Sequence, residues 1–193
     1  MLGLHWQVNV VRPEGFFGGM LSAAVASSGV VDRAARFHAA ARMAGVAGYL
    51  TRFTIPEGEG GLVRNTDFMR AVGDAQEAFR PEAPGSQLIP EMADAGEPVD
   101  NQKLSGLAGN GLAERLTTAG IDTVFVTGVA TNLTVEQTAR HGTELGLTMY
   151  VISDCVTAAD EETHTASLGN LGLAAAGCLP AADALALLVP LGA

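Results

Sequence analysis

Thr134 lies where a nucleophile is expected in a parallel α/β sheet. An apolar run at residues 124–126 stops at a Thr-Gly turn, and Glu136 and Arg140 then follow at helical spacing. This order predicts a buried strand that leads directly into a helix. Ligands in open α/β sheets bind outside the carboxyl ends of the strands, where the first N–H groups of the next helix have no partner. The head of this helix, at Thr134, is therefore our first candidate for a nucleophile.

Three segments of the chain resemble the isochorismatase-like superfamily of cysteine hydrolases. TGVATNLTVEQTAR, residues 127–140, resembles the family's nucleophile segment, with Thr134 in place of the cysteine. LHWQVNVVRPEG resembles the first-strand segment, with His5 at the position of a catalytic Asp. NQKLSGL resembles the lysine segment, with Asn101 at the lysine position. The resemblance covers about residues 2–188, so it implies the family fold with all three catalytic side chains replaced.

The resemblance also implies an oxyanion hole made by backbone groups. In the family, two N–H groups that correspond to those of Ala130 and Thr134 stabilise the oxyanion, and the peptide that corresponds to Val129-Ala130 is cis. Because the turn sequence is kept and the hole depends on the backbone, we expect the hole to be kept as well.

Our first hypothesis is that His5 acts as a general acid/base without a cysteine. An imidazole titrates near neutrality, and the oxyanion hole would bind the carbonyl of a small metabolite. The reaction would be a proton shift, elimination, addition, cyclisation or enol-ether hydrolysis, and we expect it in bacterial secondary metabolism. The residues expected to form apolar walls of the substrate pocket are Trp6, Phe16 and Phe17.

Two alternatives remain open. Thr134 could be the nucleophile of an amidohydrolase, with His5 as its base and Asn101 as the group that orients the base. The chain could instead be a catalytically silent ligand-binding or scaffold homologue, because three catalytic positions differ from the family's.

The other reactive side chains are predicted to be structural, at the surface or solvated. His38 lies on the apolar stripe of a helix predicted at residues 30–44. The two cysteines do not have the spacing of a disulfide framework or of a metal site. We predict no metal and no cofactor. The residues interpreted in this way are His38, Glu57, Glu59, Lys103, His141, Cys155, His164 and Cys178.

Strands that alternate with helices predict an α/β fold, doubly wound, with a mostly parallel sheet of about six strands and helices on both faces, as a single domain over 1–193. Residues 16–28 are rich in Gly, Ala and Ser and predict a loop. The insertion at residues 54–84 predicts a helix at 65–79, and its role stays open between shaping the pocket and making subunit contacts. The predicted strands are 1–7, 46–53, 98–102, 124–126, 147–154 and a short one from 178; the other helices are 111–119, one that ends at 145, and 161–175.

Composition and charge limit the partners. The chain has 193 residues, 48% of them apolar, and a net charge of −10. This charge argues against nucleic acid and against an anionic membrane, and no apolar run approaches the ~20 residues needed to cross a bilayer. Since a strand is predicted from the first residue, we expect no signal peptide and a cytoplasmic protein. The resemblance implies a homodimer or homotetramer.

Overall fold

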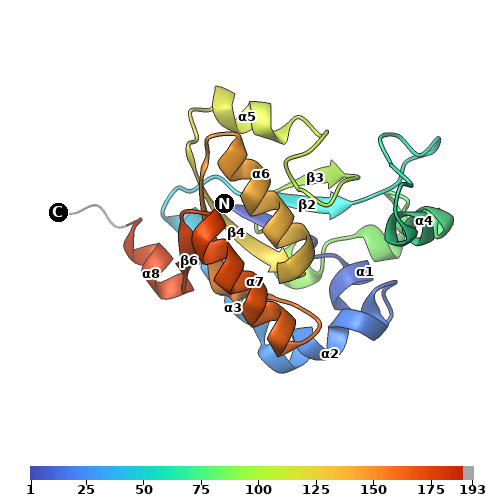
Figure 1. The fold of residues 1–193 in the computed structure, drawn as a ribbon, viewed down its shortest axis with the longest axis horizontal. Coiled ribbons are helices and arrows are strands. Elements are labelled where there is room, and N and C mark those ends of the chain that lie inside the picture. The colour runs from blue at the N-terminus through green and yellow to red at the C-terminus, as the bar shows by residue number, and fades with distance from the viewer. Residues whose placement is uncertain (189–193) are drawn as a thin grey trace.

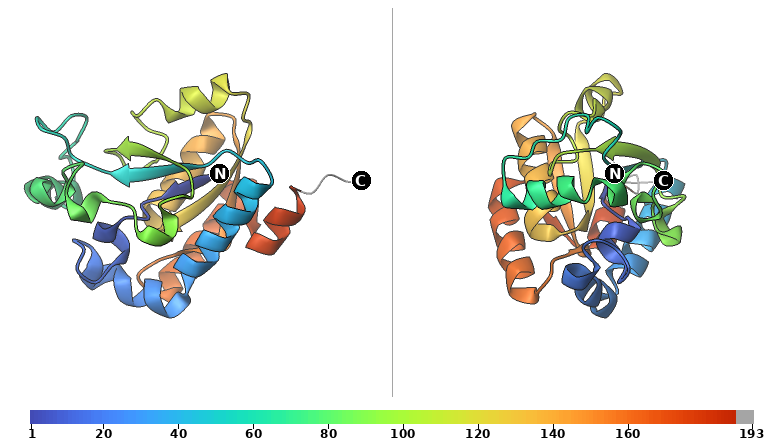
Figure 2. Two further views of the ribbon diagram at one scale, coloured as in Figure 1. Left: turned by 180° about the vertical axis from the view of Figure 1, so that it is seen from behind. Right: turned by 90° about the vertical axis from the view of Figure 1, so that its right-hand side faces the viewer.

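The protein forms a six-stranded parallel sheet between two layers of helices (Figures 1 and 2). The computed structural model describes residues 1–188, so the end of the single-domain prediction, 189–193, lies outside the described residues. The strand order is β3-β2-β1-β4-β5-β6, which confirms the predicted doubly wound α/β fold. The strands are β1 Leu2–Leu4, β2 Tyr49–Phe53, β3 Glu97–Asn101, β4 Thr123–Val129, β5 Thr148–Thr157 and β6 Gly177–Leu179.

The helices divide between the two faces of the sheet. One face packs against α2, α3 and α8 and the other against α5, α6 and α7, each over its own apolar cluster. The helices are α1 Val8–Val11, α2 Gly18–Ser28, α3 Val30–Met43, α4 Asp67–Asp74, α5 Leu112–Thr118, α6 Glu136–Glu144, α7 Glu161–Ala174 and α8 Ala181–Ala186. Shorter helical turns are η1 Gln76–Phe79, η2 Pro84–Ser86, η3 Pro90–Met92 and η4 Thr131–Val135. No helix in the described part of the chain is long and apolar enough to cross a membrane.

Two elements differ from the sequence prediction. Residues 18–28 form helix α2 instead of a loop, because the alanines of this segment are strong helix formers and outweigh its Gly and Ser residues. The helix predicted at 65–79 begins with Thr66, whose side chain accepts a hydrogen bond from the N–H of Met69, but α4 ends at Asp74 and the short turn η1 follows. The second of these segments matters for function because α4 lies beyond the arrowheads of β2 and β3 (Figure 1).

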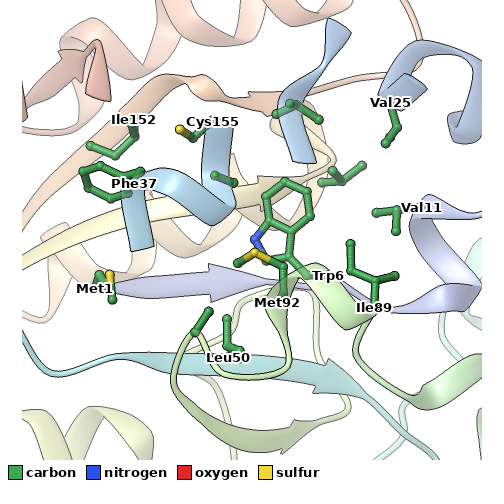
Figure 3. Packing of buried hydrophobic residues seen from close by; sticks show 14 of the residues in the cluster. Met1, Trp6, Val11, Val25, Phe37, Leu50, Ile89, Met92, Ile152 and Cys155 are labelled. Atoms are coloured by element: carbon green, nitrogen blue, oxygen red, sulfur yellow. The ribbon is translucent and has the colours of Figure 1, made fainter. Parts of the chain in front are cut away.

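Trp6 belongs to the core and does not form a pocket wall, which corrects the sequence prediction. Figure 3 shows its ring among Met92, Ile89 and other apolar side chains, and the side chain is fully buried. Its indole Nε1 donates to the Oγ1 of Thr127, 3.2 Å away, which satisfies the one polar atom of the ring. The chain turns at His5, immediately before Trp6.

Candidate functional site

A cavity of about 50 Å³ lies at the carboxyl ends of β1 and β4. These two strands are neighbours at the centre of the sheet, where the strand order reverses, and such switch points are where ligands bind in open α/β folds. His5 follows β1, Val129 ends β4, and Ala130 follows β4. The polar side chains in the wall are those of His5 and Thr134, and the rest of the wall is apolar, including Phe17, Leu21, Phe53, Phe68, Leu104 and Leu133.

The backbone of His5 is held in a left-handed conformation. Its φ is 56°, a value that residues other than glycine rarely adopt. This turn ends β1 at Leu4 instead of at the predicted residue 7. The N–H of His5 donates to the carbonyl of Thr51 at 3.1 Å, and the carbonyl of Trp6 accepts from the N–H of Ile89 at 3.0 Å. The backbone is therefore fixed on both sides of the turn.

The buried side chain of Gln7 strengthens this arrangement. Its Oε1 accepts from the N–H of Phe53 at 2.6 Å, and its Nε2 donates to the carbonyls of Phe53 at 3.1 Å and Ser86 at 3.0 Å. The amide thus pairs with the end of β2 after the backbone of β1 has turned away. The chain on the carboxyl side of His5 is therefore held by the hydrogen bonds of Trp6 and Gln7.

The imidazole of His5 is buried and lacks a hydrogen bond. Its side chain is 7% exposed, and its Nε2 finds no partner within residues 1–188. The ring lies edge-on to Phe53, with 6.2 Å between the ring centroids. Burial lowers the pKa of His5 from 6.5 to about 4, so the ring is neutral at pH 7. A neutral imidazole offers one N–H donor and one nitrogen acceptor to a ligand.

Thr134 borders the same cavity, but its hydroxyl is engaged elsewhere. The residue is 2% exposed and lies in η4, a π-helical turn that precedes α6. Its Oγ1 donates to the carbonyl of Leu104 at 2.8 Å. The hydroxyl proton is therefore held by a backbone acceptor, and the structure contains no hydrogen bond between Thr134 and His5. The backbone of Thr134 remains part of the cavity wall.

The peptide between Val129 and Ala130 is cis, which confirms the expectation from the family resemblance. Ala130 and Thr134 both line the cavity, as an oxyanion hole would require. The carbonyl of Ala130 accepts from the N–H groups of Leu133 and Val135, each at 3.2 Å. These bonds fix the turn that carries the candidate N–H groups of Ala130 and Thr134.

Asn101 is near the cavity but does not line it. Its side chain is buried, and Nδ2 donates to the carbonyls of Lys103 at 2.7 Å and Ser105 at 3.2 Å. Asparagine is shorter than the lysine of the resembled family, and the amide folds back on its own turn. This turn carries Leu104, which accepts from Thr134 and lines the cavity. Asn101 therefore positions the wall and makes no hydrogen bond to His5.

Of the residues expected to form the pocket wall, Phe17 lines the cavity, whereas Phe16 is 41% exposed and lines a neighbouring hollow. Several other wall residues were not predicted from the sequence. Phe68 and Val72 reach the cavity from α4, and their spacing of four residues on one helix face is the signal that could have indicated them. Leu104 follows no such pattern, because it sits in an irregular turn.

The remaining candidates have structural partners. His38 is fully buried, with Nε2 2.8 Å from the Oγ1 of Thr127, and Cys155 is fully buried with its pKa raised to about 12 by burial. Glu59 pairs with Arg64, which corrects the prediction that it is simply solvated. Within residues 1–188 no group of three or more His, Cys, Asp and Glu side chains is arranged to hold a metal ion.

The comparison with protein families gives a match over most of the chain: residues 4–183 match the isochorismatase domain. Two curated relatives match shorter regions. The chain is 38% identical over 63 residues to the uncharacterized isochorismatase family protein YecD of Escherichia coli O157:H7, covering 33% of this chain and 34% of that protein. It is 33% identical over 85 residues to the uncharacterized isochorismatase family protein YwoC of Bacillus subtilis strain 168, covering 43% and 45%. The matched regions thus span less than half the length of these relatives.

Solved structures resemble the whole fold. A cysteine hydrolase from Pseudomonas syringae pv. phaseolicola 1448A has a TM-score of 0.82 at 20% identity, covering 97% of this chain and 90% of that one. An isochorismatase family protein from Desulfovibrio vulgaris subsp. vulgaris str. Hildenborough has a TM-score of 0.82 at 17% identity, covering 97% and 96%. A pyrazinamidase/nicotinamidase from Streptococcus mutans UA159 has a TM-score of 0.72 at 21% identity, covering 92% and 98%. At these identities the likeness concerns the fold.

Proposed function

The chain belongs to the isochorismatase family, and we propose that it acts on a small carbonyl-containing molecule by acid–base chemistry that uses His5 and no cysteine. The observation that carries the proposal is that His5, a residue of the cavity wall, has a buried Nε2 without a partner in the described chain. An unpaired buried nitrogen costs ~1–3 kcal/mol, and a left-handed backbone adds about 1 kcal/mol. Costs of this kind, concentrated at one residue, are typical of functional sites.

The proposed reaction begins with the carbonyl oxygen of the ligand at the N–H groups of Ala130 and Thr134. The neutral imidazole of His5 takes a proton from the carbon next to the carbonyl, and the electrons of that C–H bond form the enolate. The N–H groups stabilise the negative oxygen, and the enolate in turn stabilises the imidazolium. Return of a proton to the same carbon gives exchange, and in a β,γ-unsaturated carbonyl compound return to the γ carbon gives the conjugated isomer. The same group can serve elimination, addition, cyclisation and enol-ether hydrolysis.

Solvent deuterium exchange tests this step directly. We expect the wild-type protein to catalyse exchange of the protons next to the carbonyl of 2-butanone in D2O, followed by NMR. His5→Asn should lower the catalysed rate by about 10²–10⁴-fold, the usual contribution of a general base. Asparagine tolerates the left-handed conformation, so this variant keeps the fold while it removes the base. Equal rates for wild type and His5→Asn, at equal folded content, would remove His5 from the mechanism.

Thr134→Val provides the matched control. Valine has the shape of threonine and keeps the backbone N–H, so we expect exchange to fall no more than a few-fold. This variant also tests the amidohydrolase hypothesis, in which Thr134 forms a covalent acyl adduct that intact mass would detect. The bond from Thr134 Oγ1 to the carbonyl of Leu104 argues against that hypothesis, because it leaves His5 without the hydroxyl proton.

A second candidate function is ligand binding without turnover. It is favoured by the partners of Asn101 and Thr134, whose side chains bond to backbone carbonyls and do not orient His5. A ligand that binds with dependence on His5 but shows no exchange and no other turnover would support this candidate over the first. A homodimer or homotetramer and a role in bacterial secondary metabolism remain predictions of the sequence.

A further inference from the structure

A second hollow adjoins the His5 cavity, and we call it the outer hollow. It has a volume of about 260 Å³ and lies between the start of α2 and α4. The side chains that line both the His5 cavity and the outer hollow are those of Phe17, Met20, Phe68 and Val72. The two spaces therefore adjoin and share an apolar wall, and the outer hollow lies on the surface side of the His5 cavity.

The shared wall includes two parallel aromatic rings. Phe17 and Phe68 stack with 5.6 Å between their centroids and an interplanar angle of 15°. The inner cavity holds only a small group, since ligand pockets for larger molecules measure roughly 300 Å³ or more. A ligand of ordinary size must therefore extend past these rings into the outer hollow.

No charged side chain lines either space within residues 1–188. The outer hollow also exposes large apolar side chains, with Met20 55% exposed, Phe16 41% and Phe68 37%. Apolar side chains that gather at the surface commonly mark a binding site. A charged ligand group would lose its hydration here without gaining an opposite charge.

We infer that the ligand of this site is an uncharged molecule with a small carbonyl head in the His5 cavity and an apolar tail in the outer hollow. The inference rests on the proposed function for the head and adds the chemistry of the tail. The wall that the two spaces share is the reason to assign the outer hollow to the same ligand. The absence of a cation in their walls is the reason to expect no carboxylate or phosphate.

A chain-length series tests the tail. The dissociation constants of 2-alkanones with four to ten carbons would be measured for the wild-type protein by ligand-observed NMR, with carboxylates of equal length as charged counterparts. Each methylene that enters the hollow should tighten binding about fourfold. We expect the carboxylates to bind more weakly than the ketones at every length.

Two lysine substitutions locate the tail. Ala71→Lys places a charge in the outer hollow, at an exposed residue of α4 that does not line the His5 cavity. Ala26→Lys places the same charge at an exposed residue of α2 that lines neither space. Ala71→Lys should remove most of the gain with length while 2-butanone binds as before, and Ala26→Lys should keep the full gain.

Other outcomes overturn the inference in different ways. If 2-butanone binds with dependence on His5 but longer ketones bind no tighter, the tail is wrong and the proposed function stands. If longer ketones bind tighter without any dependence on His5, the proposed function fails. A flat series, together with self-association that Ala71→Lys abolishes in analytical ultracentrifugation, would assign the outer hollow to a second copy of the chain. Failure of every ketone to bind overturns both proposals.

Discussion

His5 and His38 are both buried histidines with a pKa lowered to about 4, yet their surroundings differ. His38 sits in α3 with its Nε2 2.8 Å from the Oγ1 of Thr127, in a packed core. His5 sits in a left-handed turn with an unpartnered Nε2 beside a cavity. Burial and titration are alike, so they do not identify a functional histidine. The partners of the ring and the conformation of the backbone do.

The pH dependence of stability should show what the two residues share. The pKa of each histidine is near 6.5 in the unfolded chain and about 4 in the folded protein, mainly because burial disfavours the charged ring. Well above pH 6.5 both histidines are neutral in the folded and in the unfolded state, so they do not lower the free energy of unfolding. As the pH falls from 6.5 to 4 the unfolded state gains protons first, and each histidine removes about 3 kcal/mol from the free energy of unfolding.

Urea denaturation at several pH values checks this prediction, with His5→Asn and His38→Leu beside the wild type. In each variant the free energy of unfolding should change between pH 6.5 and 4 by about half as much as in the wild type. The amino group of Met1, whose pKa burial lowers to about 6, acts in the window from pH 8 to 6 and is common to all three proteins. A wild-type curve that is flat from pH 6.5 to 4 would contradict the neutral, buried state of both rings.

Removal of the His38 ring should affect stability and leave chemistry intact. In His38→Leu the hydroxyl of Thr127 loses one of its two partners, and we expect the free energy of unfolding to fall by about 2 kcal/mol. Deuterium exchange into 2-butanone, corrected for folded content, should match the wild type. A loss of exchange in this variant that equals the loss in His5→Asn would end the distinction between the two histidines.

Removal of the Cβ at residue 5 should stabilise the protein slightly. His5→Gly relieves the left-handed backbone and deletes the unpaired nitrogen, whereas His5→Ala keeps the Cβ. We expect His5→Gly to exceed His5→Ala by about 1 kcal/mol in the free energy of unfolding, measured at pH 7.5 where both states of His5 are neutral. If alanine were the more stable variant, the turn at residue 5 would carry no strain.

The sequence predicted the scaffold better than the side chains around the cavity. The doubly wound parallel sheet and the position of Thr134 just before α6 were predicted from the alternation of strands and helices, and the cis peptide was predicted from the family resemblance. The partners of Thr134 and Asn101 did not, because each bonds to a carbonyl in the irregular turn at residues 101–105. Nothing in the local sequence fixes the path of such a turn.

Trp6 illustrates a second limit. A strand predicted over residues 1–7 alternates its side chains between the two faces, so residue 6 could be assigned by counting. The left-handed turn at His5 breaks this alternation, so Trp6 packs in a different apolar cluster from Leu2 and Leu4. A positive φ at a residue other than glycine leaves no mark in the sequence.

The buried amide of Gln7 has a consequence for how this fold can diversify. By pairing with the end of β2, it closes the sheet edge that the departing chain would otherwise leave open. The bonds to β2 are made by the backbone of residue 5 and the amide of Gln7, so the side chain of residue 5 takes no part in holding the sheet together. The same sheet can therefore carry different reactive side chains at residue 5 without a change in its hydrogen bonds.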